Sequence, residues 1–215
     1  MAGRRALTEK EERRFLRKVR RLPFRNRTLV TTQWFTGFRI SEVLSLKVHQ
    51  VWRDRQVVSR IGVRPENLKG HRGTTRWVPV SPELRRTLQD YIGQREEEEG
   101  GPLDPAAPLI LSRQVNRDGS QRAITRGSAH VIIKEVMAKA RVHDDGRLGT
   151  HTLRKTLAKK VYVLSGKDIM VTRDAMGHSS LTVTERYLET SREDVDRAIL
   201  MGDFTRRPHR RRRST

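Results

Sequence analysis

The sequence contains no cysteine. Disulfide bonds, cysteine-ligated zinc sites and iron–sulfur clusters are therefore excluded, and the absence fits a reducing cellular interior. Long hydrophobic runs are also missing, since no segment approaches the ~18 consecutive apolar residues of a membrane-spanning helix. The N-terminal stretch MAGRRALTEKEERR is charged and has no apolar run behind it, so we expect no secretory leader. We therefore expect a cytoplasmic protein that makes no membrane contact.

Acidic residues are scarce relative to basic ones. The chain of 215 residues has 46 Lys and Arg against 25 Asp and Glu, a net charge of +21. Such an excess repels itself in the folded state, and a polyanionic partner offsets that repulsion. Nucleic acid is the partner that this balance favours.

The basic residues are densest at the C-terminus, RRPHRRRRST. Like charges at that density extend a chain, so we expect a flexible basic tail over residues 205–215. The tail either contacts phosphates or is simply a solvated end. Its candidate phosphate contacts are Arg210, Arg211, Arg212 and Arg213.

Apolar residues recur with helical spacing over most of the chain. Thr8 with Glu11 forms a capping-box pattern, Gly37 sits where a left-handed helix cap belongs, and Ser41 can cap one or two further turns. The expected helices cover about 8–20, 25–36, 82–99, 125–141, 151–165, 168–176, 180–188 and 192–200.

Between residues 48 and 80 the period changes to two. Residues 48–52, 57–61 and 76–80 alternate or carry β-branched and aromatic side chains, with polar, glycine-containing connections. This pattern predicts a mainly α protein with a small three-stranded antiparallel sheet. Internal repeats and domain boundaries are absent from the sequence pattern, so we expect one domain over residues 1–204.

Three stretches place polar side chains at suggestive intervals. TGFRISEVLSL at 36–46 contains Arg39 at a helix–helix corner, and HTLRKTLA at 151–158 places His151 and Arg154 on one helix face. MGHSSLTVTERYLE at 176–189 has His178 nine positions before Tyr187. Each stretch alone is weak, because a turn arginine is commonly solvated and a helical tyrosine commonly packs in a core.

Their joint order, however, resembles the tyrosine recombinase family, also called the phage integrase family. The resemblance covers about 36–188 and implies the catalytic-domain fold of that family. It further implies site-specific breakage and rejoining of double-stranded DNA through a 3′-phosphotyrosine, with no metal, ATP or other cofactor.

The residue types suit that chemistry independently. Cutting a phosphodiester needs a nucleophile, stabilisation of charge on the phosphate oxygens, and a proton for the leaving oxygen. Tyr187 would attack, and Arg39 and Arg154 are planar, permanently charged groups that suit phosphate oxygens. His178 can donate a hydrogen bond to a phosphate oxygen, and His151 can accept the phenolic proton.

The leaving oxygen needs an acid, and lysine can lose a proton whereas arginine effectively cannot. This favours Lys69 over Arg72, although the interval between Lys69 and the strand RWVPV is long for the family. By the resemblance, Glu42 is a carboxylate that orients the arginines; the alternative is an exposed helix acid. Further candidate DNA contacts are Arg72, Arg76 and Lys155.

Two features bear on assembly. The amphipathic segment 192–204 either docks into a neighbouring copy, in a homo-oligomer that is a tetramer on DNA, or folds back on its own domain. Full-length relatives carry a separate DNA-clamping domain ahead of the first arginine motif, whereas only residues 1–38 precede Arg39 here. We therefore expect no separate N-terminal domain, in either a minimal recombinase or an excised catalytic domain.

Two other functions remain open. A type IB topoisomerase-like enzyme would use similar chemistry to relax supercoiled DNA. A basic DNA- or RNA-binding module could keep the fold without catalysis.

Overall fold

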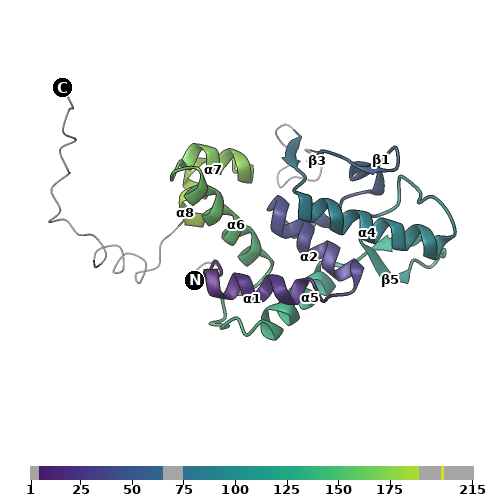
Figure 1. Cartoon of the computed structure of the whole chain (residues 1–215), viewed down its shortest axis with the longest axis horizontal. Coiled ribbons are helices and arrows are strands. Elements are labelled where there is room, and N and C mark those ends of the chain that lie inside the picture. Colours follow the sequence, from purple (N-terminus) through teal and green to yellow (C-terminus); the bar gives the residue numbers. More distant parts are fainter. Residues whose placement is uncertain (1–4, 65–74, 189–199, 201–215) are drawn as a thin grey trace, which may run out of the picture.

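The computed structural model describes residues 5–64, 75–188 and 200 of the chain. Helices dominate it (Figure 1). In chain order the elements are α1 (Glu9–Val19), α2 (Phe24–Thr36), α3 (Ile40–Leu44), the 3-10 turn η1 (Val48–Gln50), β1 (Trp52–Arg53), β2 (Gln56–Val57), β3 (Arg60–Val63), β4 (Arg76–Pro79), α4 (Pro82–Glu99), β5 (Leu111–Val115), β6 (Gln121–Ala123), α5 (Arg126–Lys139), α6 (Thr150–Leu164), α7 (Ile169–Met176) and α8 (Leu181–Leu188).

The helices predicted from periodicity are confirmed wherever the structure describes the chain. Thr8 closes the predicted capping box with Glu11, and the Ser81 hydroxyl caps α4 ahead of Pro82. The cap of α3 differs from the expectation, because Arg39 rather than Ser41 occupies the N-cap position. The predicted helix at 192–200 and the tail at 205–215 lie outside the described residues, apart from Leu200.

The expectation of one three-stranded sheet is wrong in its strand pairing. Among the described residues the strands form three separate antiparallel pairs, β1 with β2, β3 with β4, and β5 with β6. The segment from β2 to β3 bends at Val58 and Ser59, where Val58 N–H bonds to Val51 O and Ser59 O accepts from Val80 N–H. The first half of this segment, β2, therefore pairs with the preceding strand β1, and the second half, β3, pairs with the following strand β4.

The β5–β6 pair was not predicted. Its strands carry mostly exposed or half-buried side chains, so neither a continuous apolar run nor a clear alternation marks them. The pair is irregular, since its register shifts between Leu111 and Val115.

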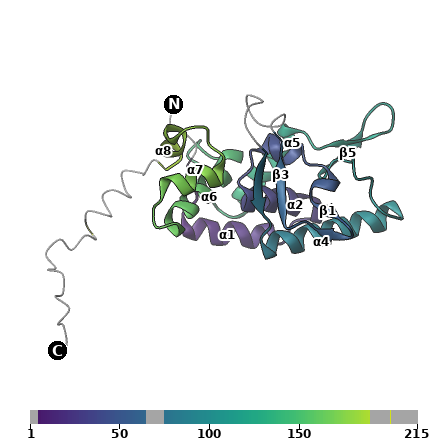
Figure 2. The same cartoon turned by 90° about the horizontal axis from the view of Figure 1, so that it is seen from above.

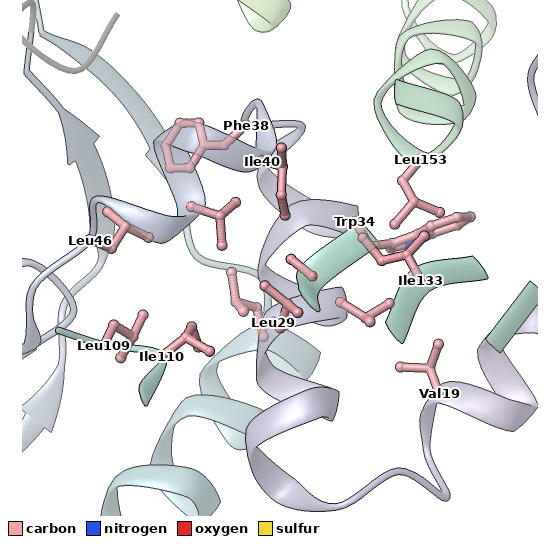
Figure 3. Close-up of a cluster of buried hydrophobic side chains, with 14 of the residues drawn as sticks. Val19, Leu29, Trp34, Phe38, Ile40, Leu46, Leu109, Ile110, Ile133 and Leu153 are labelled. Atoms are coloured by element: carbon pink, nitrogen blue, oxygen red, sulfur yellow. The ribbon is translucent and has the colours of Figure 1, made fainter. Parts of the chain in front are cut away.

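One hydrophobic core runs through the molecule, and α2 lies at its centre (Figure 3). Leu29 and Val30 of α2 are fully buried, and Trp34 packs against Phe15 of α1 with ring centroids 5.5 Å apart. Most of α2 is buried, and two of its threonines bond within the helix, Thr28 to Phe24 O and Thr36 to Thr32 O.

The elements divide to either side of α2. Helices α6, α7 and α8 gather on one side, whereas the strand pairs β1–β2 and β3–β4 lie with α4 on the other (Figures 1 and 2). No helix in the described part of the chain is long and apolar enough to cross a membrane. The C-terminal ends of α2 and α7 meet between the two groups, where the candidate site lies.

Candidate active site

Two glycines end the helices that frame the site. Gly37 caps α2 and Gly177 caps α7, both in the left-handed conformation, with φ of 61° and 60°. At the end of α7, Gly177 N–H bonds to Asp174 O and His178 N–H bonds to Arg173 O, which turns the chain sharply and directs His178 inward. The last carbonyl groups of both helices are left without helical partners, so other donors are needed.

Arg154 supplies two of those donors. Its side chain is fully buried, and it donates from Nη1 to Gly37 O and from Nη2 to Met176 O, the latter at 2.5 Å. Arg154 thus links the end of α2 to the end of α7 from the middle of α6. Burial, and then repulsion from Arg39, lower its pKa.

Arg39 is held by Glu42 one turn along α3. The carboxylate accepts from the Arg39 backbone N–H at 2.8 Å and from Arg39 Nη1 at 2.6 Å. Glu42 is fully buried, while the Arg39 side chain remains 27% exposed. The sequence alternative for Glu42, an exposed helix acid, is therefore wrong, and its predicted contact with an arginine of the site is present.

Arg76 enters the same cluster from β4. Its Nη2 donates to Thr36 O at 2.8 Å and to Ala175 O at 2.7 Å, and its Nη1 lies 3.9 Å from Glu42 Oε2. The guanidinium lies 5.0 Å from the ring centre of Phe38. Burial, followed by repulsion from Arg154, lowers the pKa of Arg76 to about 9, which leaves it charged at neutral pH.

His178 is buried at 6% exposure, and its Nδ1 lies 3.0 Å from the Thr184 hydroxyl. Its Nε2 is buried without a hydrogen bond to any described residue. Burial lowers the pKa of His178 to about 3, and the charges of Arg154, Arg39 and Arg76 act in the same direction. The imidazole is therefore neutral near pH 7.

Tyr187 lies beside these groups on α8. Its hydroxyl is 3.1 Å from His151 Nδ1, its ring centre is 4.6 Å from that of His178, and the Arg154 guanidinium carbon is 5.8 Å from its ring centre. The contacts of α8 with α6 and α7 bring Tyr187 to these three side chains. Five predicted residues therefore converge with Glu42: Arg39, His151, Arg154, His178 and Tyr187.

The charges of the cluster do not balance. Within the described residues it holds three guanidinium groups, of Arg39, Arg76 and Arg154, against the single carboxylate of Glu42. Unpaired positive charge in a largely buried site is costly unless an anion joins it. The arrangement is suited to a phosphate group, which accepts several charged hydrogen bonds at once.

The other predicted contacts stand apart. Lys69, Arg72 and the arginines of the tail lie outside the described residues. Lys155 is half-buried on α6, next to Arg154 in the chain. No three His, Asp or Glu side chains gather closely enough to share a metal ion in the part of the chain that the structure describes.

Sequence reasoning missed the contact between Thr184 and His178, and it placed Arg76 among the DNA contacts rather than in the cluster. A sequence signal exists for the first: Thr184 lies three residues before Tyr187, on the same helix face. For Arg76 the alternation appears only in the structure, where Arg76 and Val78 of β4 are less exposed than Trp77 and Pro79.

Comparison with known proteins shows the family of this chain. The chain matches the sequence model of the phage integrase family over residues 5–194. It belongs to the phage integrase family. Tyrosine recombinase XerA of Pyrococcus furiosus is 25% identical over 204 residues, which are 93% of this chain and 63% of that relative. Tyrosine recombinase XerD of Mycobacterium leprae is 32% identical over 168 residues, covering 77% of this chain and 48% of the relative.

Solved structures of integrase-family proteins share the fold. The crystal structure of XerA recombinase aligns with a TM-score of 0.68 at 21% identity, covering 92% of this chain and 63% of that one. The XerH recombinase, in a post-cleavage complex with a palindromic difH substrate, aligns at 0.68 and 22% identity over 92% of this chain and 53% of its own. The chain thus spans about half to two thirds of the length of these relatives.

Proposed function

We propose that this chain is the catalytic part of a site-specific DNA recombinase that cuts one strand through a 3′-phosphotyrosine bond. The observation that carries the proposal is the position of the Tyr187 hydroxyl, 3.1 Å from His151 Nδ1 and beside the buried guanidinium of Arg154. A potential nucleophile, a group that can accept its proton and an anion-binding cluster share one site. The names of the relatives and the DNA-bound neighbour support the same function.

In the proposed reaction, Tyr187 Oη attacks the phosphorus of a DNA phosphodiester. A bond forms between phosphorus and the phenolic oxygen as the bond to the 5′ oxygen breaks, and His151 accepts the phenolic proton. Lys69, which lies outside the described residues, donates a proton to the departing 5′ oxygen. The freed 5′ hydroxyl of a partner strand then reverses the attack, so the ester bond is conserved and no external energy source is needed.

The arginines stabilise the charge that develops during this attack. Arg39 and Arg154 donate to the non-bridging oxygens, and Glu42 holds the Arg39 fork in place. His178 is neutral, so it can donate from Nε2 once Thr184 donates to its Nδ1. These groups are fixed by helix ends before DNA arrives, so little reorganisation is needed in the transition state.

Covalent capture tests the proposal. The full chain is incubated with nicked duplexes that tile the DNA flanking its own gene, so that the freed 5′ fragment diffuses away and the adduct accumulates. The expected result is a protein–DNA species that survives denaturation and maps to Tyr187. Tyr187→Phe should retain DNA binding and form no adduct; an adduct that persists in this variant refutes the nucleophile.

The same preparation separates recombination from the two alternatives. Joining of two duplexes that share a mapped site is expected for a recombinase. Relaxation of any supercoiled plasmid, without such a site, would instead indicate a topoisomerase-like enzyme. Binding without any adduct would indicate a non-catalytic module.

We further propose that the basic tail contributes affinity and that segment 192–204 joins copies into a tetramer on DNA; both lie outside the described residues. Removing residues 206–215 should weaken binding and flatten its salt dependence by about 0.9 in log–log slope for each phosphate that the tail neutralises. An unchanged slope would contradict the role of the tail. Cross-linking on a mapped duplex, with and without residues 192–204, tests the assembly.

A further inference from the structure

Arg76 has a role that a surface DNA contact does not explain. Its side chain is 9% exposed, and a single nitrogen, Nη2, bonds both Thr36 O at the end of α2 and Ala175 O at the end of α7. These two carbonyls belong to helices that are far apart in the sequence. A positive charge at two helix C-termini also offsets the partial negative charge of both helix dipoles.

The contacts of Arg76 repeat those of Arg154 one residue earlier. Arg154 bonds Gly37 O and Met176 O, whereas Arg76 bonds Thr36 O and Ala175 O. Two arginines, one from a helix and one from a strand, thus bridge the same pair of helix ends side by side. One bridge allows the ends to pivot, and two bridges fix their relative orientation.

The backbone around Arg76 is shaped to admit it. A Cβ atom added at Gly177 would lie 2.6 Å from Arg76 Cδ, so the left-handed cap of α7 also makes room for this side chain. Phe38 covers the guanidinium at 5.0 Å from its ring centre. The side chain is therefore enclosed by the residues that follow both helix ends.

The guanidinium still has unused hydrogen-bonding capacity. Nε and Nη1 are buried and make no hydrogen bond to any described residue, and Nη1 lies 3.9 Å from Glu42 Oε2, beyond hydrogen-bond distance. The same Glu42 carboxylate pairs with Arg39, so it links the two arginines. Arg76 therefore lies beside Glu42, which holds Arg39, and bonds the carbonyls next to those that hold Arg154.

We propose that Arg76 is a positioning residue of this site: it holds the ends of α2 and α7 at the spacing that lets Arg154 and His178 bind one phosphate. This role rests on the proposed function. It differs from a direct DNA contact in what its loss affects, because Nη2 bonds the ends of two helices; the DNA affinity of Arg76 variants separates the two roles. Loss of Arg76 should thus slow the chemical step and leave DNA affinity nearly intact.

The chain offers a matched control in Arg95. That arginine is also buried, at 3% exposure, donates to two consecutive carbonyls, Pro108 O and Leu109 O, and contacts an aromatic ring, that of Tyr91. It lies on α4, where no residue of the candidate site is located. Both substitutions remove carbonyl bonds and a ring contact, and Arg95→Met also removes an ion pair with Glu99. Arg95→Met is thus at least as disruptive locally, but only Arg76 lies at the site.

The test measures adduct formation in a single turnover, on the duplex that gives most adduct with the unaltered chain, well below both melting temperatures. Arg76→Met should lower the rate constant at least about tenfold, as expected for a misplaced clamp. Its Kd for the same duplex should change by less than about threefold. Arg95→Met should lower the melting temperature and leave the rate constant unchanged.

Lysine variants keep the test decisive if either methionine variant does not fold. An ammonium group has three donors and can reach two carbonyls, so Arg76→Lys should recover part of the lost rate. An NMR titration adds a readout that needs no DNA. The pKa of His178 should rise in the Arg76 variants, where one repelling charge is removed or moved, and stay constant in the Arg95 variants.

Three results would overturn the role. They are a rate constant in the Arg76 variants equal to that of the unaltered chain, an equal rate loss in the Arg95 variants, or a loss of affinity as large as the loss of rate. The last would mean that Arg76 binds the phosphate itself. Absence of any adduct with the unaltered chain would instead refute the proposed function, and the role of Arg76 with it.

Discussion

The Nδ1 atom of His151 lies 3.1 Å from the hydroxyl oxygen of Tyr187, although 36 positions separate them in the chain. One residue is in the first turn of α6 and the other near the end of α8, so only the packing of these helices brings them together. That distance allows direct proton transfer between the two side chains. In this structure the two side chains thus meet within a single chain.

The two arginines that we propose bind the phosphate should affect stability through different partners. Arg39→Ala and Arg154→Ala should each slow adduct formation by about 10²–10³-fold, because each removes a donor to the charge that develops on phosphorus oxygens. Arg154→Ala also leaves the carbonyls of Gly37 and Met176 unpaired in the interior. Each unpaired carbonyl costs about 1–3 kcal/mol. Arg39→Ala leaves both carbonyls bonded and instead removes the ion-pair partner of the buried Glu42.

Both variants are measured by single-turnover cleavage, by a DNA-binding isotherm and by thermal denaturation. These three measurements check the predicted effects on cleavage, affinity and stability. DNA affinity should stay close to that of the unaltered chain, since the overall charge supplies it. Affinity and cleavage that fall together would show that the arginines mainly hold DNA.

Gly177→Ala should disturb the site from the backbone. At φ of 60° an alanine is strained by about 1–2 kcal/mol, and its Cβ would lie 2.6 Å from Arg76 Cδ. We expect a lower melting temperature together with slower cleavage, because His178 directly follows the distorted cap. Gly93→Ala within α4 is the control: its Cβ meets nothing within 4 Å, and the change should stabilise the chain by about 0.5–1 kcal/mol.

Thr184 should determine which nitrogen of His178 carries the proton. Its single hydroxyl proton can go to His178 Nδ1 or to Ser180 O, which lies 3.4 Å away. Only the first choice leaves a proton on Nε2 for a phosphate oxygen. Thr184→Val removes the hydroxyl, so cleavage should slow by about tenfold or more, the effect typical of a missing orienting partner.

Thr184→Ser retains the hydroxyl and serves as the control, with cleavage close to that of the unaltered chain. ¹⁵N spectra of His178 report the tautomer directly in each variant. If Thr184→Val changed neither the His178 tautomer nor the cleavage rate, Thr184 would not determine the tautomer.

The depressed pKa of His178 should make stability depend on pH. The folded chain has this pKa at about 3, compared with 6.5 for an ordinary histidine. As the pH falls below about 6.5, the unfolded chain takes up a proton that the folded chain does not, so stability decreases by up to about 1.4 kcal/mol for each pH unit. The contribution of neutral His178 to folding stability is complete above pH 6.5 and is lost as the pH falls toward 3.

Denaturant unfolding between about pH 6.5 and 5 measures this slope, since ordinary carboxyl groups titrate at lower pH. Glu11, which Arg5 and backbone N–H groups hold at a pKa of about 2, begins to contribute below its ordinary value of 4.5. His178→Gln should flatten the slope in the upper window. Equal slopes in the unaltered chain and in His178→Gln would mean that other groups take up the proton on unfolding.

Local patterns were enough to predict the helices, whereas the six converging residues were predicted from the family resemblance that the motifs carry together. A cap such as Gly37 or a capping box such as Thr8 with Glu11 depends on neighbours in the sequence, so it is visible without a structure. The order of the motifs supplied the remaining information. Each predicted member of the cluster lies at a helix end or on a helix face that packs against another member.

Long-range pairing could not be read from the sequence in the same way. The bend at Val58 and Ser59 splits the expected sheet because the partners of that segment, Val51 and Val80, lie on either side of it in the chain. The burial of Arg76 likewise depends on two helix ends that meet only in the folded molecule. Charged residues are rarely buried, so composition alone assigned Arg76 to the surface.

Tyr187 lies on the last described helix, which packs on α6 and α7, whereas the carbonyl bonds of Arg154 and Arg76 join α2 to the end of α7. Moving α8 away would withdraw the reactive oxygen and leave these bonds intact. In the proposed recombinase, a displaced α8 would thus stop strand cutting and leave the arginine cluster in place, so cutting and duplex binding would be separable.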